Sequence, residues 1–192
     1  MRETNLFVVS GPSAVGKTSV VNEILKRDDS LSRIVTYTTR TKRESEKHGE
    51  DYFFIAKKDF LSAAERGDFV EFSEVYGNYY GIAFSTLKEK MKEGKDAVLV
   101  INWEGFLKIK KALPKNVYGI FILPPSIEEL ERRIRSRGED SPETISRRMV
   151  LAANDIKKVE FYDFSFKNFD IETTAGDILA TIDEIRQKSP IA

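Results

Sequence analysis

The sequence predicts a three-layer α/β fold in which helices cover both faces of a central parallel sheet. An apolar run at residues 6–9 is followed by a glycine-rich loop and then by apolar residues at helical spacing in 19–26. Further along the chain, apolar runs alternate with amphipathic stretches, as they do in doubly wound sheets. The run 97–101 is continuously apolar, which is typical of a parallel strand that is covered on both faces.

The other elements follow in chain order. Strands are predicted at residues 6–9, 35–39, 52–55, 69–75, 97–101 and 118–123. Helices are predicted at 19–26 and at about 58–67, 85–92, 142–153 and 175–187. Another helix begins after Ser126, because a serine followed by acidic residues favours a helix N-terminus. The segment 35–84 holds short strands, many aromatic residues and clustered arginines, which indicates a small subdomain inserted over the carboxyl edge of the sheet.

Composition narrows the class of protein. A chain of 192 residues predicts one domain, and the absence of cysteine excludes disulfides and thiolate metal sites. His48 is the only histidine, so zinc sites built from several histidines are excluded as well. Lys and Arg number 31 and Asp and Glu number 31, which argues against a protein that coats nucleic acid. No apolar run approaches the length of a membrane span, so we expect a cytoplasmic protein with no membrane partner.

Residues 11–18 fit the phosphate-binding pattern G-x-x-x-x-G-K-[ST] at every specified position. Gly11 and Gly16 allow several backbone N–H groups to point at one anion, and the following helix adds its positive dipole end. Lys17 supplies a mobile cation for the β- and γ-phosphates, and the Thr18 hydroxyl can bind Mg²⁺. The predicted nucleoside triphosphate site comprises Gly11, Pro12, Ser13, Ala14, Val15, Gly16, Lys17 and Thr18.

A second group of residues indicates another anion site. Arg40 and Arg43 lie three apart after a predicted strand, and Tyr52 follows nine residues later. Two guanidinium groups and a phenol can hold a phosphate dianion, the arginines with bidentate geometry. Taken alone, the basic run from Arg40 to Lys47 is equally typical of a solvated loop.

Together these motifs resemble guanylate kinase, the enzyme family that phosphorylates GMP at the expense of ATP. The resemblance covers essentially the whole chain. It rests on the phosphate loop, T-T-R-x-x-R from Thr38, H-G-E-D-Y-F-F from His48, G-N-Y-Y-G from Gly77, I-F-I-L-P-P-S from Ile120 and R-x-R-G around Arg137. It implies the reaction ATP + GMP = ADP + GDP, with Mg²⁺ accompanying ATP and with dGMP as a further acceptor.

The resemblance also implies the organisation of the chain. It predicts the P-loop NTPase fold with a central parallel sheet, an inserted mixed α/β subdomain that binds the nucleoside monophosphate, and a helical lid. One domain spans residues 1–192, with its core at 1–34, 85–130 and 155–192. The monophosphate-binding subdomain covers about 35–84 and the lid about 131–154.

The family's roles fall on particular residues. Those that hold the GMP phosphate match Arg40, Arg43, Tyr52 and Tyr80. The guanine edge is contacted by the residues that match Thr36 and Glu71. Glu71 offers two adjacent acceptors to guanine N1–H and the exocyclic amine, a pair that adenine cannot satisfy.

The arginine-rich segment 132–138 matches the family's mobile lid. Arg133 and Arg137 lie four apart on one helix face, and Arg148 follows in a second helix. These arginines match groups that contact ATP and the transition state, and Asn168 matches an asparagine near the adenine. The implied catalytic residues are Lys17, Arg40, Arg137 and Arg148, and the implied ATP contacts add Arg133 and Asn168 to the loop. The alternative, a nucleic-acid patch, is disfavoured by the zero net charge.

Four positions depart from the family pattern, and one of them is Ser45, where the family commonly has glycine in a turn. Val100 and Asn102 stand where the family usually has acids at the end of the central strand, and Ile82 stands where a serine or threonine usually contacts guanine O6. Ile82 and Asn102 are kept in the predicted GMP site. These changes leave an alternative open, namely a nucleotide-binding or scaffold domain of this type, or a kinase with altered monophosphate specificity. The intact phosphate loop favours an active kinase.

Overall fold

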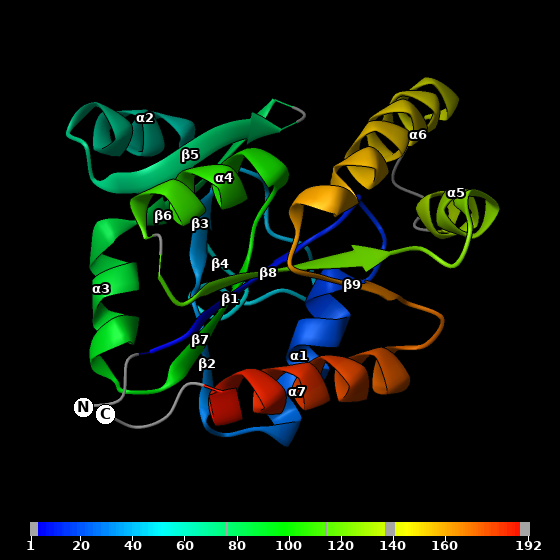
Figure 1. The fold of residues 1–192 in the computed structure, drawn as a ribbon. Helices are drawn as coiled ribbons and strands as arrows, with labels where there is room; N and C mark the ends of the chain where they lie inside the picture. The colour runs from blue at the N-terminus through cyan, green and yellow to red at the C-terminus, as the bar shows by residue number, and fades with distance from the viewer. Residues whose placement is uncertain (1–3, 76, 114, 137–140, 189–192) are drawn as a thin grey trace.

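The computed structural model describes residues 4–75, 77–113, 115–136 and 141–188, and within them the chain forms two sheets (Figure 1). The larger sheet contains β1 (Leu6–Ser10), β2 (Leu31–Arg33), β7 (Asp96–Val100), β8 (Val117–Leu123) and β9 (Phe164–Lys167). Its order is β2-β7-β1-β8-β9, and every neighbouring pair is parallel. The predicted central parallel sheet is therefore confirmed.

The smaller sheet is inserted between β2 and β7 in the sequence. It contains β3 (Thr36–Thr38), β4 (Tyr52–Phe54), β5 (Phe69–Val75) and β6 (Asn78–Ala83), in the order β4-β3-β6-β5. The β3–β4 pair is parallel and the other two pairs are antiparallel, so the sheet is mixed.

Helices cover both faces of the larger sheet (Figure 1). The helices among the described residues are α1 (Lys17–Arg27), α2 (Lys57–Glu65), α3 (Phe84–Lys92), α4 (Trp103–Ala112), α5 (Ile127–Arg135), α6 (Pro142–Ile156) and α7 (Ile171–Lys188), with a 3₁₀ turn at Lys157–Phe161. No helix among the described residues is both long and apolar enough to cross a membrane.

Strand β1 shows why the central runs are apolar throughout. Phe7 and Val9 face a core cluster shared with α1 and α7, whereas Leu6 and Val8 face a second cluster shared with α3 and α4. Successive side chains of a strand point to opposite faces of the sheet. A strand whose two faces are both covered therefore carries apolar residues throughout, rather than alternating polar and apolar ones. The end of β1 is thereby fixed in the middle of the molecule, where the glycine loop begins.

The smaller sheet has two unlike faces. One face packs on α2 through Phe60, whose ring centroid lies 4.4 Å from that of Phe69 and 5.5 Å from that of Tyr79. The strand register puts Thr36 opposite Tyr52 and Ser73 opposite Tyr80 on the other face. This second face carries the polar side chains that the sequence singled out.

The structure adds elements that the sequence pattern did not predict. They are β2, β6, β9 and α4, and α7 begins at Ile171 rather than near residue 175. The predicted strands at 69–75 and 118–123 are confirmed within one residue, and Ser126 does cap α5 by accepting from the Glu129 N–H at 3.2 Å.

Candidate active site

The glycine loop between β1 and α1 has the backbone shape that its sequence predicts. Gly11 has φ +148° and Gly16 has φ +102°, a region that favours glycine. A Cβ at residue 11 would collide with the carbonyl oxygen of Ile122 in β8, and a Cβ at residue 16 would meet the side-chain nitrogen of Asn168 at 2.5 Å. A side chain at residue 11 would therefore displace backbone, and one at residue 16 would displace the Asn168 side chain and strain the positive-φ backbone.

Lys17 and Thr18 begin α1 directly after the loop. The Lys17 Nζ donates to the carbonyl oxygens of Gly11 and Pro12, each at 2.8 Å, so its ammonium lies over the loop. The N-cap residue is Gly16, which has no side chain to satisfy the first N–H groups of the helix. Those N–H groups and the exposed Thr18 form a helix start that could bind an anion, as predicted for this loop.

Arg133 and Asn168 converge on the same loop from two distant segments. The Asn168 Nδ2 donates to the Val15 carbonyl oxygen at 2.8 Å, and Arg133 Nη1 donates to the same oxygen at 3.3 Å. Arg133 Nη2 also donates to the Asn168 carbonyl at 3.2 Å, while its Nε is held by Glu129 Oε1 at 2.8 Å. Both predicted ATP contacts thus lie at the loop and brace its backbone.

The structure says less about the other two arginines of the predicted lid. Arg137 lies outside the described residues. Arg148 is partly buried on α6, whose Ile145 and Ala152 pack in the same core cluster as Val15 of the loop. Helix α6 therefore contributes to the core cluster that lies on one face of the larger sheet.

The second anion site assembles on the polar face of the smaller sheet. The Arg40 guanidinium carbon lies 5.6 Å from the Tyr52 ring centroid and 5.7 Å from that of Phe54. The rings of Tyr52 and Tyr80 are 6.1 Å apart. Burial lowers the pKa of Arg40, but Glu46 and Tyr80 outweigh it and hold that pKa above its ordinary value. The structure thus brings three predicted phosphate-binding residues together.

Glu46 belongs to this anion site, although the sequence did not single it out. Its Oε1 accepts from Arg40 Nη2 at 2.6 Å, and its Oε2 accepts from the backbone N–H of Arg43 at 2.8 Å. Burial raises the pKa of Glu46, but those hydrogen bonds outweigh burial and keep the pKa below its ordinary value. Glu46 therefore fixes Arg40 and the backbone at Arg43 relative to each other.

Glu71 lies on β5 of the smaller sheet. Its side chain is 1% exposed, and its Oε2 accepts from Lys108 Nζ of α4 at 3.3 Å. Its Oε1 is buried with no hydrogen-bond partner. Burial raises the pKa of Glu71, and Lys108 offsets part of that rise. A buried carboxylate oxygen without a donor is an unfilled acceptor for a polar ligand.

The remaining predicted GMP contacts differ in their surroundings. Thr36 is 7% exposed and lies on the same sheet face as Tyr52. Ile82 is fully buried among apolar residues of α3, α4 and the larger sheet. The Asn102 Oδ1 accepts from Gly105 N–H at 3.0 Å as the cap of α4, and its Nδ2 donates to Ser73 Oγ at 2.9 Å. Both polar atoms of Asn102 are thus engaged within the protein.

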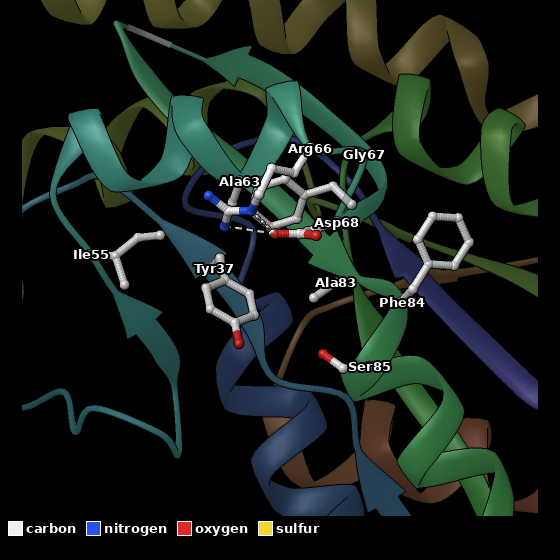
Figure 2. A pocket seen from close by; sticks show the side chains of 10 residues that line it. Tyr37, Ile55, Ala63, Arg66, Gly67, Asp68, Ala83, Phe84 and Ser85 are labelled. Carbon is white, nitrogen blue, oxygen red and sulfur yellow. Dashed lines mark hydrogen bonds and ion pairs between the residues drawn. The ribbon is translucent and has the colours of Figure 1, made fainter.

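The described part of the chain contains no group of three or more His, Asp and Glu side chains that could bind a metal ion. A separate pocket of about 390 Å³ lies between α2 and the start of α3 (Figure 2). The Arg66–Asp68 ion pair, 2.7 Å, lines it together with Tyr37 and Phe84. None of the predicted site residues lines this pocket.

A parallel sheet with a phosphate-binding loop after its first strand, together with an inserted sheet that carries an arginine–tyrosine anion site, defines a P-loop kinase of the nucleotide-kinase type. The family model described as guanylate kinase matches residues 3–185. The chain therefore belongs to the guanylate kinase family.

Individual relatives agree with this assignment. Guanylate kinase of Alkalilimnicola ehrlichii is 40% identical over 175 residues, which cover 91% of this chain and 86% of the relative. Guanylate kinase of Vibrio parahaemolyticus is 40% identical over 190 residues, which cover 98% of this chain and 91% of the relative. The crystal structure of guanylate kinase from Anaplasma phagocytophilum superposes with a TM-score of 0.79 at 33% identity, covering 100% of this chain and 89% of that one.

Proposed function

We propose that this protein transfers the γ-phosphoryl group of ATP to GMP, producing ADP and GDP, a step of purine nucleotide metabolism. The observation that carries the proposal is the buried Glu71 carboxylate with its unpartnered Oε1, on the sheet that also bears Arg40 and Tyr52. A carboxylate acceptor complements guanine N1–H and the exocyclic amine, whereas adenine presents an acceptor at N1. Membership of the guanylate kinase family supports the same reaction.

In the proposed reaction, ATP binds the loop 11–18 with Arg133 and Asn168 beside it. A GMP phosphate oxygen attacks the γ-phosphorus in line while the bond to the ADP oxygen breaks, with no covalent enzyme intermediate. Lys17, Arg137 and Arg148 stabilise the negative charge that spreads over the transferred group. No side-chain base is needed, because a phosphate monoester with a second pKa of about 6 is already ionised at neutral pH.

For the acceptor we assign two groups of contacts. The phosphate of GMP, or of dGMP, is held by Arg40, Arg43, Tyr52 and Tyr80, and the base lies against Thr36, Glu71, Ile82 and Asn102. The segments 35–84 and 131–154 act as the monophosphate-binding subdomain and the lid, and the rest of the chain is the core. Closure of both over the substrates would exclude water, which otherwise hydrolyses ATP.

Mg²⁺ fits this site as a companion of ATP. Thr18 offers an exposed hydroxyl at the first turn of α1, and Mg²⁺ in kinases takes its other ligands largely from phosphates and water. When bound, the ion neutralises charge on the phosphate oxygens. The Val100 side chain provides no ligand atom, and Asn102 is engaged in the helix cap. Thr18 is therefore the protein ligand that we assign.

A second candidate is a kinase with altered base specificity. Ile82 gives guanine O6 an apolar neighbour, and the Asn102 amide is held by Gly105 and Ser73. A missing polar partner at O6 would weaken the preference for 6-oxopurine over 6-aminopurine monophosphates. A missing acceptor for the exocyclic amine would weaken the preference for GMP over other 6-oxopurine monophosphates.

A coupled assay of ADP release tests both candidates. With Mg²⁺-ATP we expect turnover of GMP and dGMP, and at least about 100-fold lower kcat/KM with AMP and UMP. Lys17→Ala should abolish transfer while GMP binding persists, because the lysine ammonium binds the carbonyl oxygens of the phosphate-binding loop. IMP turnover close to that of GMP would favour the second candidate, and no turnover of GMP above background would overturn the first.

A further inference from the structure

Lys108 of α4 is the cation next to the carboxylate that we assign to guanine. Its Nζ lies 3.3 Å from Glu71 Oε2 and donates to the Phe72 carbonyl at 3.1 Å. The same ammonium lies 6.0 Å from the Phe72 ring centroid. The Lys108 side chain is 54% exposed, so its ammonium group contacts water as well as the buried Glu71 carboxylate.

Helix α4 approaches Glu71 closely enough to make this contact a fixed one. Gly105 lies one turn before Lys108, so both face β5. A Cβ at residue 105 would lie 2.8 Å from Glu71 Oε1. The carboxylate is therefore confined between the helix backbone, which faces Oε1, and the lysine, which binds Oε2.

Few other charges act on Glu71. On α4, Glu104 works against ionisation, and Lys108 works in favour of it. On β6, the residue paired with Glu71 is Ile82, which carries no charge. Burial is the largest influence and raises the pKa of this carboxyl. Lys108 is thus the group that opposes the protonation of Glu71.

We propose that Lys108 is a positioning residue that holds Glu71 as an oriented carboxylate and thereby determines the preference for guanine over adenine. The proposal rests on the proposed function and deepens it. An ionised carboxylate presents two acceptors, which match the N1–H and amine donors of guanine. A protonated carboxyl presents one donor and one acceptor, which match the N1 acceptor and N6 donor of adenine. The charge state of one side chain therefore selects the base.

The test compares Lys108→Ala with Lys108→Arg, which keeps the charge. Lys111→Ala is the matched control, because Lys111 is an exposed lysine on the same helix. Steady-state kcat and KM are measured for GMP and AMP from about pH 6 to about pH 8.5, together with equilibrium GMP binding by calorimetry.

For Lys108→Ala we expect the KM for GMP to rise about tenfold at the acid end, the change produced by one unit of pKa, with kcat nearly unchanged. The penalty should shrink toward high pH, and the GMP:AMP ratio of kcat/KM should fall most at low pH. Lys108→Arg should restore most of the affinity, and Lys111→Ala should match the wild type.

A KM penalty that is equal at every pH with an unchanged GMP:AMP ratio would overturn the proposal, as would no change in Lys108→Ala. If the wild type does not turn over GMP, the proposed function fails. The calorimetric comparison then decides the role of Lys108. GMP binding by Lys108→Ala that weakens more toward low pH than binding by the wild type supports that role. Absence of GMP binding by every form would overturn both.

Discussion

Glu46 shows how much a single charged side chain organises the acceptor site. A run of basic residues would repel itself and sample many conformations in solution, but Glu46 binds the Arg40 guanidinium and the Arg43 backbone at once. Arg40 also donates to the Thr41 carbonyl at 2.7 Å and stacks near Tyr52. The guanidinium is therefore held in one orientation before it meets a phosphate, which lowers the entropy cost of binding.

We expect Glu46→Gln to raise the KM for GMP by about tenfold, since losing a charge-assisted hydrogen bond costs on the order of 1.4 kcal/mol. The amide nitrogen of glutamine would face the Arg43 N–H, where the carboxylate now accepts. Steady-state kinetics at saturating ATP measure the effect, with kcat nearly unchanged. Glu50→Gln is the control, because Glu50 is an exposed partner of Lys47 at 3.3 Å. An unchanged KM in Glu46→Gln would refute the positioning role.

Helix α4 depends on a cap that also connects it to the smaller sheet. Asn102 accepts from Gly105 N–H and donates to Ser73 of β5, so one side chain fixes the start of α4 against the strand that carries Glu71. The same helix supplies Gly105 and Lys108 to that carboxylate. The N-terminus of α4 is thus a structural support of the base site.

Asn102→Ala should destabilise the protein by about 1 kcal/mol, with a range of about 0.5–2, through loss of the cap. It should also raise the KM for GMP, because α4 can then shift relative to β5. Asn102→Asp keeps an acceptor for the Gly105 N–H, so it should lower the free energy of unfolding by less than Asn102→Ala does. Urea unfolding midpoints for the three proteins check the order, and an Asn102→Ala midpoint equal to that of the wild type would contradict the capping argument.

Strands that are buried on both faces could be predicted from the sequence, whereas the two edge strands of the larger sheet, β2 and β9, could not. The runs that form β1, β7 and β8 are apolar because both faces are covered. Strand β2 has only three residues, and β9 alternates partly buried and exposed residues at the sheet edge. Such short strands take their conformation from their neighbours, so local pattern carries little of it.

The same contrast holds for the site. The loop 11–18 is contiguous, so its spacing alone predicts a phosphate-binding loop. Glu46 and Lys108 stand among other charged residues, and such residues are usually solvated. Their partners, Arg40 and Glu71, are brought near them by the folding of the chain. Asn102 was expected at the base, and the structure adds its role as a helix cap, which depends on where α4 begins.

At the scale of the whole molecule, one arginine joins the C-terminal helix to the beginning of the fold. Helix α7 lies beside α1 below the larger sheet (Figure 1). Arg186 of α7 binds Asp96 at the start of β7 and Asp28 after α1, each at 2.8 Å. Asp96 is 2% exposed on its side chain and also accepts from the Asn5 N–H at 3.0 Å. Segments far apart in the sequence thus meet at a single guanidinium.

Arg186→Ala should destabilise the protein by about 3–5 kcal/mol at neutral pH, because it removes a guanidinium from the buried Asp96 carboxylate. Arg135→Ala is the control, since its pair with Glu131 is half exposed and is expected to contribute less than about 1 kcal/mol. Urea unfolding at pH 7 measures both free energies. A loss as small as that of the control would show that Asp96 needs no counter-charge.

The pH dependence of this loss follows from Asp28. Burial raises the pKa of Asp28, but hydrogen bonds from Ser30 and Arg186 outweigh it and keep the pKa below its ordinary value of 3.8. A carboxyl whose pKa is depressed by folding stabilises the protein above its unfolded pKa, and that contribution disappears as the pH falls through the folded pKa. The difference between wild type and Arg186→Ala should therefore narrow as the pH falls below about 4, because Asp28 becomes protonated first in the unfolded chain and then in the folded one. Unfolding curves at pH 7 and at about pH 3 test this, and a difference that widens toward acid would contradict the role of Asp28 in the network.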